Sequence, residues 1–150
     1  MIVDLDVLGE IETQIAVLMR LAEATRRADP AREYRALDRA AYVILRHLAD
    51  SGPLNVSALA ARLNLDGSTV TRQVSAMQRE GLVRREADPR DGRGTVIAPT
   101  AAGLRRMAGV RDARREAYGE ILATWSPTDR AELAAMLARL NGALDARFKK

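Results

Sequence analysis

The sequence predicts a mainly α-helical fold with one small β-hairpin. Over most of the 150 residues, apolar side chains recur at steps of three and four, as one face of a helix requires. Only residues 82–98 combine short β-compatible segments with a centre rich in turn residues. Two short helical segments directly precede this stretch. The order helix, helix and hairpin is that of a winged helix-turn-helix.

The composition favours one folded domain, residues 1–150, and excludes several enzyme classes. The chain is 47% hydrophobic and 29% charged, which is too apolar for intrinsic disorder. It has no Cys and one His, so thiol nucleophiles, disulfides, Cys-ligated zinc and thiol redox switches are excluded. No paired carboxylates, nucleophile with a base or phosphate-binding Gly loop stands out. We expect no enzyme, metal or cofactor.

The first residues do not resemble a targeting segment. Asp4, Asp6 and Glu10 stand where a secretory leader would carry positive charge. No apolar run approaches the roughly 20 residues needed to span a bilayer. We therefore expect a cytoplasmic protein with no membrane partner.

Two helices are expected before the helix-turn-helix. The first runs from Leu8 to about Arg27 and is ended by Asp29-Pro30. The second runs from Leu37 to Asp50, where Ser51-Gly52-Pro53 supplies a turn. Both show helical periodicity without strand-like alternation.

The helix-turn-helix is expected at about residues 56–80. Asn55 is a suitable N-cap for a helix over 56–63, and Asp66 is the expected N-cap of a longer helix over 68–80. Gly81 supplies the C-terminal stop. This longer helix is the candidate recognition helix.

The hairpin, or wing, is expected at about residues 82–98. Its strands are 82–87 and 95–98, joined by a turn with basic residues at its tip. Pro99 has no N–H to donate to a strand ladder, so we expect the second strand to end at Ala98.

Two long helices follow the wing. Thr100 is the expected N-cap of a helix to about Thr124, and Ser126 with Pro127 opens a last helix that reaches Phe148. These two helices and the first one carry apolar faces that need a partner. We therefore expect residues 1–36 and 101–150 to form a dimer, with residues 37–100 as the winged DNA-binding region.

One face of the candidate recognition helix suits the major groove of DNA. Val70, Val74 and Met77 share the buried side, and hydroxyl and guanidinium side chains occupy the rest. Hydroxyls can donate to phosphates or base edges, and an Arg can read guanine, for which Arg72 is the first candidate. These polar residues are Ser68, Thr69, Thr71, Arg72, Ser75 and Arg79. Alternatively, Arg72 and Arg79 are solvated side chains, although the small residues at the helix N-terminus favour close approach to DNA.

The tip of the wing is a second candidate contact. Arg90 and Arg93 project from a tight turn, and a narrow minor groove attracts an inserted Arg. Alternatively, the tip is a charged turn in which Asp88 and Asp91 neutralise both Arg side chains. Asp91 could also hold Arg93 extended through a charge-assisted hydrogen bond, as a wing-orienting residue.

Residues 37–148 resemble a MarR-type (multiple antibiotic resistance regulator) transcription factor. The most specific feature is the pair Asp91 and Arg93 in the wing, followed at a fixed distance by Thr100. The helix-turn-helix match is less specific because many winged-helix families share it. The matching stretches are Leu59-Ala60-Ala61-Arg62-Leu63, Ser68-Thr69-Val70-Thr71-Arg72-Gln73-Val74, Glu80-Gly81-Leu82-Val83, Asp88-Pro89-Arg90-Asp91-Gly92-Arg93 and Thr100-Ala101-Ala102-Gly103.

This resemblance implies a homodimeric regulator, most often a repressor, that binds a pseudo-palindromic operator in double-stranded DNA. It implies that Arg93 enters the minor groove, while Ala76 stands where some members carry a second Arg. Whether Arg79 takes a phosphate instead stays open, as does activation versus repression. The residues that it implies for the major groove are Ser68, Thr69, Thr71 and Arg72.

The resemblance also implies a small aromatic or phenolic effector that releases the DNA. No ligand-binding residue is assigned, because the candidate side chains are expected first in the core or the dimer interface. These candidates are Tyr34, Tyr42, Arg46, His47, Tyr118 and Trp125. Without Cys, thiol oxidation cannot be the switch.

Charge leaves an alternative function open. The net charge is +4 overall, but residues 55–99 hold seven basic and five acidic side chains, a net charge of only +2. Total charge is thus weak support for a nucleic-acid partner. The alternative is a winged-helix protein-interaction module that does not bind DNA.

Overall fold

The computed structural model describes residues 2–28 and 37–149, which form six helices and one antiparallel hairpin. The prediction of a mainly α-helical fold with a small hairpin is confirmed. The chain divides into two compact units, residues 1–36 and 37–150.

The first unit contains α1 (Ile2–Ala28). This helix begins earlier than the predicted Leu8, because no Gly or Pro interrupts the preceding residues. The predicted stop at Asp29-Pro30 lies outside the described residues. Large apolar side chains of α1 are exposed, among them Leu5 at 73%.

The second unit begins with α2 (Arg39–Ser51), whose N-cap is Asp38 rather than a residue before the predicted start at Leu37. The carboxylate of Asp38 accepts from the backbone N–H of Ala41 at 2.7 Å. Leu37 is itself buried, so its apolar character marks a core contact and not the first helical turn.

The helix-turn-helix consists of α3 (Val56–Leu63) and α4 (Gly67–Arg79). The predicted N-caps are confirmed, since Asn55 and Asp66 each accept from the N–H three residues later at 2.7 Å. The chain turns between the helices at Asn64, which has a left-handed backbone with φ of 52°.

The wing consists of β1 (Val83–Ala87) and β2 (Thr95–Pro99). The expectation that the second strand ends at Ala98 is wrong, because Pro99 pairs with Val83. Pro99 lacks a donor, but it occupies the end of the ladder and its carbonyl can still accept. Leu54 adds a bridge to the other side of β2 through two backbone hydrogen bonds with Ile97, of 2.7 and 3.1 Å.

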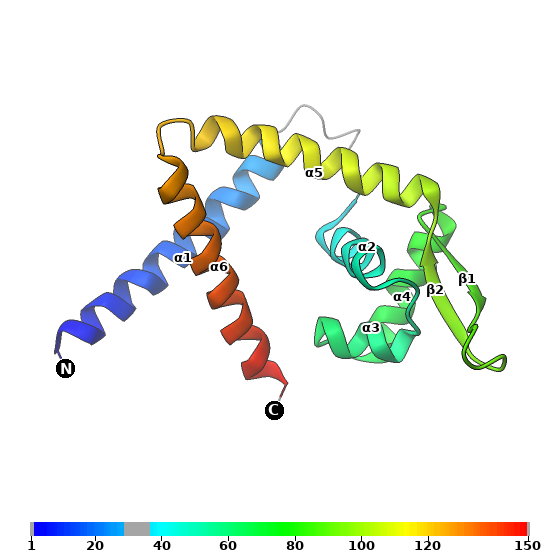
Figure 1. The fold of residues 1–150 in the computed structure, drawn as a ribbon. Coiled ribbons are helices and arrows are strands. Elements are labelled where there is room, and N and C mark those ends of the chain that lie inside the picture. Colours follow the sequence, from blue (N-terminus) through cyan, green and yellow to red (C-terminus); the bar gives the residue numbers. More distant parts are fainter. Residues whose placement is uncertain (1, 29–36, 150) are drawn as a thin grey trace. The chain divides into compact units, whose positions relative to one another are not determined.

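The core of the second unit joins α2 and the helix-turn-helix to the hairpin. Figure 1 shows α2 and α4 beside the hairpin and α3 next to α4, and the hairpin leads into α5 (Ala101–Ile121). The largest fully buried side chains are Ile44, Leu45, Leu48, Leu59, Leu82, Ile97, Val70, Val74 and Val83. This packing holds α4 with its polar face outward.

The last two helices, α5 and α6 (Pro127–Phe148), have the predicted N-caps Thr100 and Ser126. The predicted end of α5 at about Thr124 is wrong, because the helix ends at Ile121. The guanidinium of Arg130 donates two hydrogen bonds to the Leu122 carbonyl oxygen, at 2.7 and 3.0 Å. These bonds cap the turn between the helices. No residue of α6 is buried.

Candidate nucleic-acid interface

The polar face of α4 is available to a partner. Val70 and Val74 are fully buried and Met77 is 3% exposed, as the helical periodicity predicted. Of the six predicted contact residues on this helix, four are exposed, and Thr69 and Ser75 are half-buried. The exposed ones are Ser68, Thr71, Arg72 and Arg79.

Asp66 organises the beginning of this face. One carboxylate oxygen accepts from the Ser68 hydroxyl at 2.6 Å and from the Thr69 N–H at 2.7 Å. The other oxygen accepts from the Thr69 hydroxyl at 2.9 Å. Hydrogen bonds from the Ser68 hydroxyl, and then from the Thr69 N–H and hydroxyl, lower the pKa of Asp66 to about 2. The carboxylate is therefore ionised at neutral pH and acts only as an acceptor.

These bonds reverse the expected polarity of the hydroxyl groups. The sequence suggested that they donate to phosphates or bases, but the Ser68 and Thr69 protons point to Asp66, and Thr71 donates to the Gly67 carbonyl at 2.8 Å. The oxygen lone pairs remain for an external donor. In a major groove such donors are the amino groups of adenine and cytosine, because phosphates only accept.

The two Arg side chains of α4 keep most of their donors free. Arg72 donates weakly to the Thr69 hydroxyl oxygen at 3.4 Å, which draws its guanidinium toward the beginning of the helix. Within the described part of the chain, the Arg79 guanidinium has no hydrogen-bond or ion-pair partner. Both therefore remain available for an acceptor on another molecule.

Ser75 contacts Arg85, a residue that the sequence did not indicate as part of this site. Arg85 on β1 donates to the Gln78 side-chain oxygen at 3.1 Å and, at the longer distance of 3.5 Å, to the Ser75 hydroxyl oxygen. Ser75 is thus partly occupied by the wing. No spacing rule within α4 could have indicated this contact, because its donor comes from the following strand.

The wing tip is ordered by two Asp side chains that bind backbone. Asp88 accepts from the Arg90 N–H at 2.8 Å, and Asp91 accepts from the Arg93 N–H at 3.1 Å. The hydrogen bond by which Asp91 holds Arg93 runs from the backbone N–H of Arg93 to the carboxylate. Among the described residues, neither guanidinium has an ion-pair partner. Asp91 orients the turn, and both cationic groups stay free.

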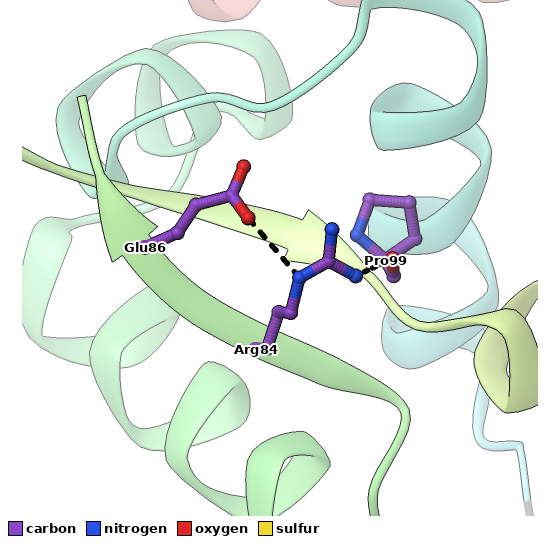
Figure 2. Close-up of polar contacts among 3 residues, drawn as sticks. All are labelled: Arg84, Glu86 and Pro99. Atoms are coloured by element: carbon purple, nitrogen blue, oxygen red, sulfur yellow. Dashed lines mark hydrogen bonds and ion pairs between the residues drawn. The ribbon is translucent and has the colours of Figure 1, made fainter. Parts of the chain in front are cut away.

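Arg84, one residue before Arg85, is instead engaged within the hairpin. Figure 2 shows its guanidinium between Glu86 on the same strand, at 3.1 Å, and the Pro99 carbonyl oxygen, at 2.9 Å. Adjacent Arg residues on β1 thus have different partners, as the alternation of side chains along a strand requires.

The candidate effector residues that the structure describes differ in their surroundings. Tyr42 is half-buried against the core, with the Arg114 guanidinium 4.7 Å from its ring centre, and Tyr118 is 60% exposed. Trp125 lies beyond the end of α5, so it is not on the same helix as Tyr118. His47 and Arg46 are half-buried, and Tyr34 lies outside the described residues.

An open concavity of about 480 Å³ lies at the turn between α5 and α6. It is lined by Thr124, Trp125, Asp129, Glu132, Leu133 and Met136. In residues 2–28 and 37–149, no group of three or more acidic or His side chains is arranged to hold a metal. None of the helices described is both long and apolar enough to cross a bilayer.

Comparison with known proteins identifies a family. Residues 37–95 match the profile described as the MarR family. An uncharacterized HTH-type transcriptional regulator of Bacillus subtilis (strain 168), YxaD, is 35% identical over 107 residues. That alignment covers 71% of this chain and 75% of the relative.

Solved structures agree with this assignment. A probable transcriptional regulator from Pseudomonas aeruginosa has a TM-score of 0.65 and 29% identity, with 87% of this chain and 98% of that chain covered. The PcaV transcriptional regulator from Streptomyces coelicolor, solved with its natural ligand, has a TM-score of 0.62 and 27% identity. In this case 85% of this chain and 91% of that chain are covered.

Proposed function

The chain belongs to the MarR family of transcriptional regulators, and from this premise we propose that it is a homodimeric repressor of a pseudo-palindromic operator. The family and the names of the relatives are those of helix-turn-helix regulators and not of enzymes. Repression, dimerisation and control by a ligand are the parts that we propose.

One observation carries the proposal most directly. The guanidinium groups of Arg72, Arg79, Arg90 and Arg93 lie on α4 and the wing tip, and no described carboxylate pairs with them. Their placement supports DNA binding better than the small net charge, because unpaired cations can replace the counterions of phosphates.

We propose that α4 lies in the major groove and that Arg93 enters the adjacent minor groove. Arg72 would read a base, since most of its donors are free and its guanidinium is held near the beginning of α4. Arg79 and Arg90 would bind DNA phosphates, and Asp91 would stabilise the conformation of the wing tip. The remaining proposed contacts are Ser68, Thr69, Thr71 and Ser75.

Exposed apolar helices support dimerisation. In α6, Met136 is 60% exposed, Leu144 47% and Phe148 71%, and α1 also carries exposed Leu and Ile side chains. Monomers rarely leave so much apolar surface uncovered. We propose that residues 1–36 and 101–150 form the dimer and that residues 37–100 bind DNA. The two recognition helices would then enter major grooves about 34–36 Å apart.

The PcaV regulator was solved with its natural ligand, and this likeness supports control by a small molecule. We propose an aromatic or phenolic effector that lowers the affinity for DNA.

The test combines two measurements on the full chain. Light scattering after gel filtration should give twice the monomer mass of 16.4 kDa. Gel-shift titration against the DNA upstream of its own gene should show binding that weakens steeply with salt. Absence of binding, or binding that is insensitive to salt, would contradict the proposal and favour a protein-interaction module.

A further inference from the structure

Arg85 joins the wing to the recognition helix by side-chain contacts. It lies on β1, and its guanidinium donates to Gln78 at 3.1 Å and to Ser75 at 3.5 Å, both in the C-terminal half of α4. Gln78 is exposed and uncharged, so the pair lies at the surface, outside the core in which Val83 of β1 and Val74 of α4 are buried.

The hairpin is held at its base by different interactions. Thr100 donates its hydroxyl to the Gly81 carbonyl at 2.6 Å, and its N–H donates to the Leu82 carbonyl at 3.0 Å. These bonds lie at the end of the hairpin that is far from the tip.

Arg85 acts further along the hairpin, at a level that is restrained on both sides. Its cross-strand partner is Ile97, which forms the backbone bridge with Leu54. Leu54 therefore holds one edge of the hairpin while Arg85 ties the other strand to α4. A hairpin that is held at its base and at a second point along its length has a defined direction.

We propose that Arg85 is a positioning residue, which sets the angle between the wing and α4 so that Arg93 reaches the minor groove while α4 occupies the major groove. This inference rests on the proposed function. Arg85 would affect the affinity for DNA by positioning Arg93. Ser75 and Gln78 on α4 would accept the hydrogen bonds of Arg85 that hold this position.

A different role for Arg85, a direct phosphate contact, predicts different energetics. A phosphate contact would contribute independently of Arg93, and changes at the two residues would add. Positioning predicts that the benefit of Arg93 depends on Arg85, so the two changes would be strongly non-additive.

The test is a double-mutant cycle in operator binding, measured by fluorescence anisotropy with the full chain. We expect Arg93→Ala to weaken binding about tenfold in the wild-type background and less than about threefold in Arg85→Ala, since a tenfold change is about 1.4 kcal/mol. Arg84→Ala is the matched control, because its partners lie within the hairpin. In that background the full effect of Arg93→Ala should persist.

Gln78→Met separates positioning from charge. It removes the nearer of the two acceptors of Arg85, keeps every charge and preserves side-chain length, so we expect it to reduce the effect of Arg93→Ala in the same direction as Arg85→Ala does. Thermal unfolding of each variant checks that the fold is retained. If Arg85→Ala does not fold, the double-mutant cycle is measured with Gln78→Met in its place.

Three results would overturn the inference. Additive effects of Arg85→Ala and Arg93→Ala would assign Arg85 to an independent contact, and an unchanged Arg93 effect in Gln78→Met would remove the link through α4. If the wild-type dimer binds no DNA, the proposed function fails together with the inference. Binding that is intact but additive refutes the inference alone.

Discussion

Gly103 in α5 lies directly against Leu82 at the entry to the wing, so that a Cβ at Gly103 would stand 2.1 Å from the Leu82 carbonyl oxygen. The same Cβ would approach a methyl group of Leu45 in α2 at 3.2 Å. Only a residue without a side chain allows α5 to begin this close to the hairpin.

Gly103→Ala should therefore destabilise the fold by roughly 1–3 kcal/mol, because backbone atoms must shift to relieve the overlap. Gly109→Ala is the matched control, since nothing lies within 4 Å of its Cβ position in the same helix. There the greater helix propensity of Ala should stabilise by about 0.5–1 kcal/mol. Urea unfolding measures both, and equal effects would contradict the close approach.

Acid should weaken the beginning of α4. Folding lowers the pKa of Asp66 from 3.8 to about 2, so its carboxylate stabilises the fold above pH 4. That contribution is lost as the pH falls through about 2. Asp66→Asn should retain the cap and lose this pH dependence. Thermal unfolding midpoints between pH 5 and pH 2 compare the two proteins, and parallel curves would refute the role of Asp66.

Asp66→Asn should also change which base is preferred beside Thr69. The amide nitrogen of Asn donates where Asp66 accepts, so the Thr69 hydroxyl would turn its proton outward. The preference should shift from a base with an amino group to one with a carbonyl, guanine or thymine. Binding selection from randomised operators measures this shift.

The control for this change is the same substitution in a Thr69→Val background. Without the hydroxyl, Asp66→Asn should leave the preference at that position unaltered. A shift that persists in the Val background would place its origin elsewhere on α4.

Substitutions of Arg72 and Arg93 should change DNA binding in different ways. Arg72→Ala should cost roughly 1–3 kcal/mol on the preferred operator and relax the choice of one base. Arg93→Ala should weaken binding to all sequences and reduce the salt slope by about 1. Titrations at several salt concentrations on matched and mutated operators distinguish these outcomes. Equal losses on every sequence for both variants would contradict the assignment.

A charge on the exposed face of α6 should break the dimer. Leu140 is 37% exposed, and Leu140→Glu would place a carboxylate within the proposed interface, where its desolvation is costly. Light scattering should then show the monomer mass at micromolar concentration. Leu65→Glu is the control, because Leu65 is 40% exposed but lies in the turn before α4. If both variants remain dimeric, α6 is not at the interface.

Four of the helix N-caps were predictable because a cap is a local interaction. Asn55, Asp66, Thr100 and Ser126 each bind an N–H three residues along the chain, and the residue types alone indicate this. The end of α5 was misplaced by contrast, because Arg130 from the next helix supplies its cap.

The order of the elements, the buried side of α4 and the family to which the motifs point could be predicted from the sequence. Helical periodicity and turn chemistry act over a few residues, so they can be recognised along the chain. The partner of each polar side chain became visible only in the folded chain. Asp91 binds the backbone of Arg93, Asp66 binds hydroxyl protons of α4, and Arg85 binds acceptors on that helix. A hydrogen bond depends on distances of a few tenths of an ångström between groups that only the packed fold brings together.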